Sequence, residues 1–109
     1  MEASMEERVL ELKAEILKAL AQPTRLKILE LLRNGEKCIC EICPAINGEQ
    51  SNISRHISLM QKSHLVTTHK EGVRVMVKVS DPEIFEILNK VSDILKNQMK
   101  EQKRLLAQI

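Results

Sequence analysis

Three cysteines carry the most reactive side chains of this 109-residue sequence, in the arrangement Cys-x-Cys-x-x-Cys. Cys38, Cys40 and Cys43 lie too close together for a framework of structural disulfides. In a reducing compartment such a cluster indicates a metal site or a redox site. Thiolates favour soft centres such as Cd(II), Pb(II) or Cu(I), whereas Zn²⁺ requires a fourth ligand that no further cysteine supplies.

Helix geometry separates one of these thiols from the other two. Cys40 and Cys43 are spaced to share a helix face, but Cys38 lies about 200° around the axis from Cys40. All of them can converge on one ion only if Cys38 lies outside the helix or the first turn unwinds. We therefore expect ligand capture to distort the start of this helix.

Two other roles for the cysteines stay open. Neighbouring thiols can oxidise to a disulfide, which would make the cluster a redox sensor. On a helix Cys38 and Cys40 are awkward partners for such a bond, whereas Cys40 and Cys43, or an intersubunit pair, remain available. Free cysteine is also a small apolar residue, so the other role is a merely structural one in the core.

A second group of functional residues begins at Gln50. One face of a predicted helix over 50–63 is apolar, with Ile53, Ile57 and Met60. Hydrogen-bonding side chains near its N-terminal end suit base edges in the major groove, since Arg can fork onto guanine and Asn or Gln onto adenine. The candidate base contacts are Gln50, Ser51, Asn52 and Arg55.

The charge pattern indicates one localised polyanion-binding segment. The net charge is +2, but residues 50–80 carry +4, between a segment of −2 over 1–49 and a neutral one over 81–109. The single aromatic residue, Phe85, leaves no platform for stacking unpaired bases. The expected polyanion is therefore double-stranded DNA rather than a single strand.

Phosphate contacts are expected from Lys62, Lys70 and Arg74, at the end of the predicted helix and in the hairpin that follows it. Ser54 and His56 either touch phosphates or pack the helix through local hydrogen bonds. Surface or loop positions are expected for the remaining histidines, His64 and His69.

Hydrophobic periodicity predicts four helices, a β-hairpin and a long last helix. Pro44 falls in the third helix and is acceptable there only in the first turn. Valines at period two, from Val73 to Val79, indicate a half-buried strand after a turn at Glu71-Gly72. The predicted ranges are helices 5–21, 23–33, 40–46 and 50–63, strands 65–69 and 73–79, and a helix from 81 to 108.

This order predicts a mainly α fold with a small β contribution (α+β), a winged helix-turn-helix. We expect a single domain over residues 1–109, with the helix-turn-helix at 40–63 and the wing at 65–79. The helices at 5–21 and 81–108 keep apolar stripes that nothing else in the domain covers. We therefore expect them to be the dimerisation helices of a homodimer.

Two separated motifs carry a family resemblance. Gln50–Ile57, QSNISRHI, followed by Leu65-Val66 and Glu71-Gly72, is similar to the reader helix and wing of the ArsR/SmtB family of bacterial and archaeal repressors. Ala21–Leu29, AQPTRLKIL, resembles that family's second-helix opening. The resemblance implies a repressor that binds an imperfectly palindromic operator in double-stranded DNA.

The cysteines fit the same resemblance. Glu36–Cys43, EKCICEIC, resembles the cysteine box of the arsenic- and antimony-responsive members, with Glu41 where Asp is common. It implies that As(III), Sb(III) or another thiophilic ion is the effector, bound by up to three thiolates, and that it releases the protein from DNA. No cofactor is required.

Two residues that flank the reader helix depart from the family pattern. Glu49 stands where Ser or Thr is usual before the reader helix, and His64 stands where Gly is usual after it. The family's other metal site uses His and carboxylate ligands on the last helix. Residues 80–109 contain no His, so we expect that site to be absent.

Other function classes are disfavoured. No apolar run is long enough to span a membrane and no signal peptide opens the chain, so we expect a cytoplasmic protein with no membrane partner. A thiol enzyme needs a group that orients Cys and His, and none can be inferred, so we expect no enzyme. A winged helix that binds only proteins is the remaining alternative, since the fold is used both ways.

Overall fold

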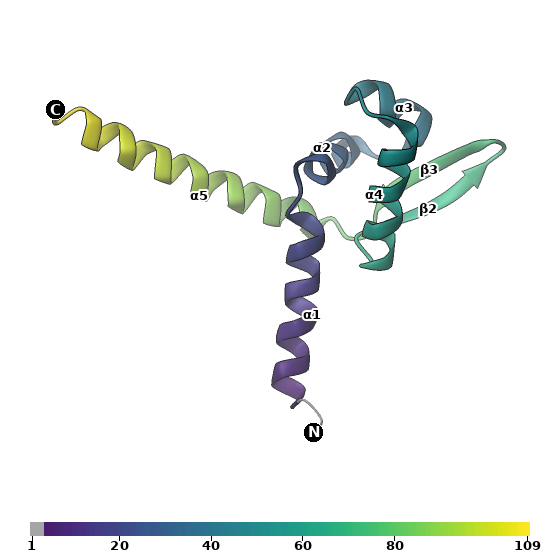
Figure 1. Ribbon diagram of the computed structural model, residues 1–109, viewed down its shortest axis with the longest axis horizontal. Helices are drawn as coiled ribbons and strands as arrows, with labels where there is room; N and C mark the ends of the chain where they lie inside the picture. The colour runs from purple at the N-terminus through teal and green to yellow at the C-terminus, as the bar shows by residue number, and fades with distance from the viewer. Residues whose placement is uncertain (1–3) are drawn as a thin grey trace.

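The computed structural model describes residues 4–109 (Figure 1). Its elements are α1 Met5–Leu20, α2 Pro23–Leu31, the 3₁₀ turn η1 Leu32–Asn34, β1 Lys37–Cys38, α3 Ile39–Ala45, α4 Gln50–Lys62, β2 Val66–Glu71, β3 Arg74–Val79 and α5 Glu83–Leu106. Helices α3 and α4 form the helix-turn-helix, and β2 and β3 form the wing, which confirms the predicted fold class. Of the described residues, none belongs to a helix that is long and apolar enough to cross a membrane.

The antiparallel sheet has the strand order β1-β3-β2. The sequence pattern does not predict β1, because two residues are too few to show a period. Cys38 of β1 lies opposite Met76 of β3, and Met76 lies opposite His69 of β2. Paired residues point to the same face of a sheet, so β1 places the first cysteine on the same face as His69.

The core lies between helices α2, α3 and α4 and the inner face of the wing. The face of α4 that was predicted to be apolar is buried, which fixes the helix against the body of the domain. Fully buried side chains come from all of these elements: Ile28, Leu29, Ile42, Ile53, Met60, Val66 and Val77.

Two local predictions are wrong. Because Cys38 is the N-cap, α3 begins at Ile39, and Pro44 lies in its last turn rather than its first. The proline there removes the hydrogen bond that its missing amide would donate to the carbonyl of Cys40, and its ring crowds that carbonyl. Val73 is fully exposed rather than on the buried face, since the hairpin turns at Gly72-Val73 with Gly72 at φ +63°.

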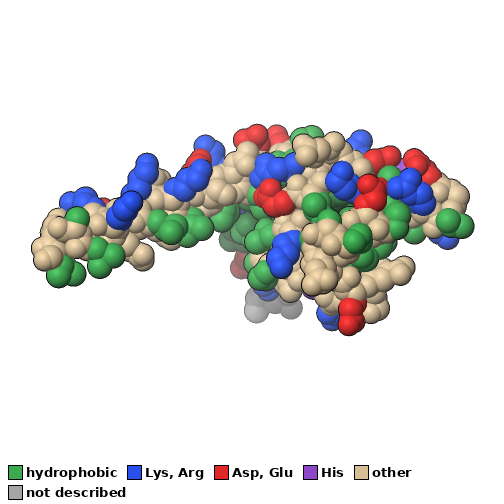
Figure 2. Space-filling view, turned by 90° about the horizontal axis from the view of Figure 1, so that it is seen from above, with side chains coloured by type: hydrophobic (Ala, Val, Ile, Leu, Met, Phe, Trp, Pro, Cys, Tyr) green, Lys and Arg blue, Asp and Glu red, His purple; other side chains and the backbone are tan. Residues whose placement is uncertain are grey.

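Helices α1 and α5 extend away from the body in different directions (Figure 1). The radius of gyration is 17.4 Å, against about 13 Å for a compact chain of this length. Figure 2 shows hydrophobic side chains along one side of the projecting α5 and Lys and Arg along the other. The exposed apolar residues include Val9, Leu10, Leu12, Ile16 and Leu17 on α1 and Val91, Ile94, Leu95, Met99, Leu105 and Leu106 on α5.

A Schellman motif closes the C-terminal end of α4. The amide of Leu65 donates to the carbonyl of Met60 at 2.9 Å, and the amide of His64 donates to the carbonyl of Gln61 at 3.0 Å. The motif needs a left-handed backbone at His64, whose φ is +60°. Glycine adopts this conformation without the steric cost that a side chain adds.

His64→Gly is expected to raise the free energy of unfolding by about 0.5–1 kcal/mol, because it relieves strain at positive φ. Chemical denaturation of both proteins measures the difference. Ser63→Gly is the matched control, since Ser63 has φ −88° and glycine there should only lower stability. A His64→Gly protein that is less stable than wild type would contradict this assignment.

Candidate nucleic-acid interface and thiol cluster

Helix α4 presents one continuous exposed stripe. Exposed residues lie on one face by their spacing, away from the core: Ser51, Arg55, Ser58 and Lys62. Gln50 is also exposed at the start of the helix. The N-cap residue makes no side-chain hydrogen bond. The first amides of α4 therefore stay available to an anion, in addition to the side chains of the stripe.

An open hollow of about 640 Å³ lies in front of the N-terminal half of this stripe. Ser51, Asn52 and Arg55 line it from α4, and Thr24 and Lys27 line it from α2. Sequence reasoning missed Thr24 and Lys27, because α2 was interpreted only as a core helix. The polar side chains of these two residues in the first turns of α2 could have indicated that this side of the helix is exposed.

Arg55 and Asn52 are held together at the edge of the hollow. Nη2 of Arg55 donates to Oδ1 of Asn52 at 3.0 Å, across one turn of α4. A guanidinium that is already oriented loses less conformational freedom when it forms a bidentate contact. Ser54 lies beside this pair and is half-buried.

His56 does not lie on this surface. Its side chain is 5% exposed and faces the interior, so a phosphate contact is wrong for this residue and the packing role applies. Its Nδ1 accepts a hydrogen bond from Nε of Arg25 at 3.1 Å. The same guanidinium donates from Nη1 to the carbonyl of Ala19 at 3.1 Å. Arg25 therefore ties the end of α1 and the start of α2 to the middle of α4.

The environment of His56 keeps its imidazole neutral. Burial lowers the pKa of His56 below its ordinary value, and the positive charges of Arg25 and Arg55 lower it further. A neutral ring offers Nδ1 as an acceptor, and a protonated ring does not. The contact that positions α4 therefore depends on the neutral form.

The basic residues at the end of α4 and in the wing differ in whether an acidic side chain already pairs with them. Lys62 and Lys70 are exposed, and neither forms an ion pair within residues 4–109. Arg74 is also exposed, but its Nη2 lies 2.9 Å from Oε1 of Glu41. A phosphate contact from Arg74 must compete with this ion pair.

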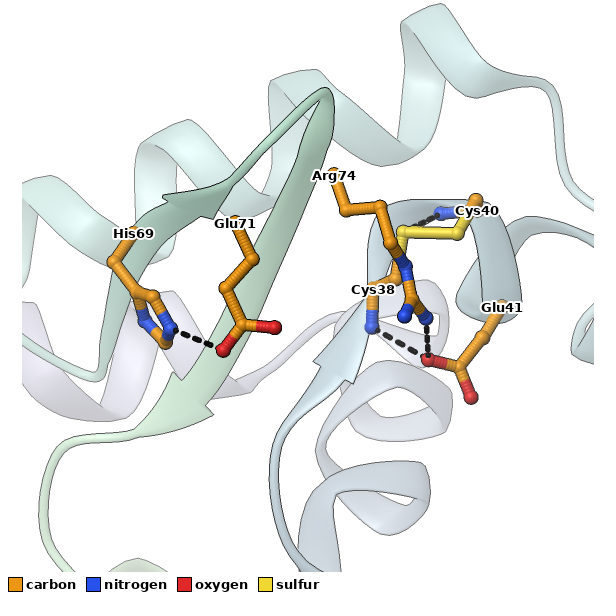
Figure 3. Close-up of polar contacts among 6 residues, drawn as sticks. All are labelled: Cys38, Cys40, Glu41, His69, Glu71 and Arg74. Carbon is orange, nitrogen blue, oxygen red and sulfur yellow. Dashed lines mark hydrogen bonds and ion pairs between the residues drawn. A yellow bond between two sulfur atoms is a disulfide. The ribbon is translucent and has the colours of Figure 1, made fainter.

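Cys38 is the N-cap residue of α3 and so lies outside the regular helix. The three thiols could converge on one ion only if Cys38 left the helix, and this position meets that requirement. Its amide donates to Oε1 of Glu41 at 3.0 Å, and its Sγ accepts from the amide of Cys40 at 3.0 Å, which forms a capping box (Figure 3). A disulfide joins Cys38 to Cys40, whose Cα atoms are 5.0 Å apart. The expectation that these two are awkward partners is wrong, because it placed both of them within a regular helix.

One carboxylate oxygen connects the thiol cluster to the wing. Oε1 of Glu41 accepts both the amide of Cys38 and the guanidinium of Arg74 (Figure 3). Cys43 carries a free thiol, is half-buried and packs against the core. The three cysteines therefore differ: two form a disulfide at the start of α3, and the other stands further along the same helix.

The buried His56 predicts acid sensitivity. The unfolded chain binds a proton at His56 below pH about 6.5, whereas the folded protein, with its lowered pKa, does not. The contribution of His56 to the free energy of unfolding is therefore complete above that pH. It falls as the pH drops toward the folded-state pKa, with a slope of at most about 1.4 kcal/mol per pH unit.

Urea denaturation between pH 7.5 and 5 measures this loss in the wild type. The matched control is His56→Gln, which keeps an acceptor for Arg25 but does not titrate. Its stability should depend less steeply on pH. Identical slopes for the two proteins would show that His56 is not the group responsible.

Comparison with known proteins places this geometry in a family. The profile described as "Bacterial regulatory protein, arsR family" matches residues 22–68. An HTH-type transcriptional regulator of Methanocaldococcus jannaschii is 38% identical over 82 residues, which cover 74% of this chain and 92% of that protein. An arsenical resistance operon repressor of Staphylococcus xylosus is 36% identical over 80 residues, which cover 73% of this chain and 76% of that protein.

Solved structures agree with the fold. The homodimeric winged helix-turn-helix DNA-binding domain Mb0332 of Mycobacterium bovis has a TM-score of 0.81 at 23% identity and covers 92% of this chain and 93% of that one, so it supports the fold alone. Rv0081 of M. tuberculosis has a TM-score of 0.78 at 27% identity and covers 86% of this chain and 95% of that one. The chain belongs to the arsR family of bacterial regulatory proteins, which are helix-turn-helix transcriptional regulators and not enzymes.

Proposed function

We propose that the protein is a homodimeric repressor that binds a specific, imperfectly palindromic operator in double-stranded DNA. The observation that carries this proposal is the outer stripe of α4, with Arg55 and Asn52 held beside the hollow that Thr24 and Lys27 complete. A helix-turn-helix presents its second helix to the major groove in this way. Gln50, Ser51, Asn52 and Arg55 are the proposed base contacts, and Lys62, Lys70, Arg74 and Ser54 the proposed phosphate contacts.

A second copy of the chain accounts for the projecting helices. The apolar residues of α1 and α5 remain exposed along most of both helices. Isolated exposed leucines are common on proteins, but two long apolar stripes on one small domain mark an interface. A two-fold dimer through α1 and α5 would cover them and present two α4 helices to successive half-sites.

For the effector we propose a trivalent metalloid, As(III) or Sb(III), bound by Cys38, Cys40 and Cys43. The donor set suits a soft, three-coordinate centre. Cys38 and Cys40 are adjacent, and their disulfide must be reduced before they can act as thiolates. Cys43 is on the same face of α3 as Cys40 but is packed against the core. Binding through all three sulfurs therefore requires the start of α3 to move.

That movement would act on the wing and on α4. When Cys38 leaves the N-cap position, its hydrogen bonds to the Cys40 amide and the Glu41 carboxylate are lost. The Glu41 carboxylate, which pairs directly with Arg74, then loses one of the two contacts that position it. Because α3 packs on α4, the pose that binds DNA would be lost as well. The ligand releases DNA to the extent that it binds the displaced form more tightly.

A redox sensor is the second candidate, and the disulfide between Cys38 and Cys40 favours it. The oxidised pair, however, coexists with an intact capping box and an intact Glu41–Arg74 pair. Oxidation of these two residues therefore leaves the start of α3 in place. The two proposals consequently predict opposite effects of oxidation on DNA binding.

Arg55→Ala is expected to weaken operator binding by about 5- to 150-fold, which corresponds to one bidentate base contact of about 1–3 kcal/mol, and to relax the preference at one base position. Anisotropy titrations with the operator and with single-base variants measure both effects. Lys96→Ala on α5 is the control, because it removes one positive charge far from α4. An unchanged affinity for the operator would show that Arg55 does not contact a base.

Reduced protein is expected to leave labelled operator DNA when arsenite is added. Protein oxidised at Cys38 and Cys40 should stay bound and should not respond to arsenite, since two of its ligands are occupied. Cys43→Ser should need more arsenite for release, because one thiolate is missing. Release by oxidant alone, in the absence of arsenite, would favour the redox sensor and contradict the metalloid proposal.

A further inference from the structure

One edge of the wing brings together a second set of ligand side chains, Glu36, His69 and Glu71. Nε2 of His69 lies 3.3 Å from Oε1 of Glu71 and 3.7 Å from Oε2 of Glu36. One donor atom from each residue lies within 4.8 Å of the other two. Figure 3 shows the His69 ring and the Glu71 carboxylate turned toward one another. None of these residues belongs to α4 or to the thiol cluster.

The strands explain why these side chains meet. His69 and Glu71 are two residues apart on β2, so both point to the same face of the sheet. Glu36 immediately precedes β1, two residues before Cys38. Cys38 pairs with Met76 of β3, and Met76 pairs with His69 of β2. The pairing of the three strands therefore brings these side chains together, and no free loop is needed to do so.

The two carboxylates of this cluster lack the basic partner that the fold could have given them. Arg74 lies directly opposite Glu71 in the register, but its guanidinium pairs with Glu41 instead. Within residues 4–109, neither Glu36 nor Glu71 forms an ion pair with a Lys or Arg, and His69 is the residue both of them approach. Two negative charges are thus placed together around one imidazole nitrogen.

The spacing is close to that of a divalent ion's coordination sphere, which small rotations of the exposed side chains would complete. Imidazole nitrogen and carboxylate oxygen bind Zn²⁺ at about 2.0–2.2 Å, which places neighbouring ligand atoms about 3–3.6 Å apart. We propose that Glu36, His69 and Glu71 form a site for a divalent cation of borderline hardness, such as Zn²⁺, with water completing the coordination. The donors are nitrogen and oxygen only, so the site differs in metal preference from the cysteines.

Occupation of the site would join the segment before β1 to strand β2 across β3. It would also cancel the negative charge of the two carboxylates beside the wing. The simpler account of the same geometry is an ordinary surface hydrogen bond between His69 and Glu71. Direct metal titration separates the two accounts, and it does not depend on the proposed DNA binding.

Co(II) is the probe, because its visible absorption reports binding and a sulfur-to-cobalt band in the near ultraviolet reports thiolate ligands. The background is the full chain with Cys38→Ser, Cys40→Ser and Cys43→Ser, because a serine hydroxyl can still cap α3. One Co(II) per chain should bind without the sulfur band. His69→Gln should weaken this binding at least about tenfold, since loss of an outer-shell partner alone costs that much.

His64→Asn is the matched control, because it removes another exposed histidine and Asn tolerates the positive φ at that position. Its cobalt affinity should equal that of the background. In the wild-type chain with the Cys38–Cys40 disulfide intact, Zn²⁺ should raise the unfolding temperature and shift the imidazole NMR signals of His69 and not those of His56. The proposal would be overturned if the His69→Gln protein bound cobalt as tightly as the background protein, or if zinc did not shift the His69 signals.

Discussion

The start of α3 depends on the capping box between Cys38 and Glu41. Cys38 ends β1 and caps α3 at once, so the residue with a reactive sulfur is also the junction between sheet and helix. Oε1 of Glu41 accepts the Cys38 amide and the Arg74 guanidinium together. A ligand that draws this sulfur away from the N-cap position therefore has effects beyond the sulfur, because the same contacts hold the first turn of α3 and the turn end of the wing.

The reading helix is positioned by a different and more buried set of contacts. The apolar face of α4 packs in the core, and His56 accepts a hydrogen bond from Arg25, which also binds the carbonyl at the end of α1. Because these contacts are buried, α4 behaves as a rigid support for the outer stripe. The thiol cluster can affect α4 only through the packing of α3 against it. Helix α3 is therefore the element that couples the thiol cluster to the DNA-reading surface.

Much of the fold follows from local pattern, since the apolar periods of α1, α4 and α5 and the alternation of β3 are strong signals. The failures have specific causes. Strand β1 is too short for a period, and its pairing with β3 is a long-range contact that no local pattern records. His56 was left between two roles, because helix spacing does not reveal that Arg25 supplies a buried partner. The cluster around His69 brings together β2 and the segment before β1, and so it required the sheet register.

The central claim is that a ligand at the thiols acts on the wing through Glu41. NMR spectroscopy of the reduced protein during titration with arsenite tests it directly, by following the Cys38 amide and the Nε–H signal of Arg74. The account predicts that both signals change together and saturate at the same arsenite concentration. Saturation of the Cys38 signal while Arg74 and the other wing resonances stay unchanged would contradict it.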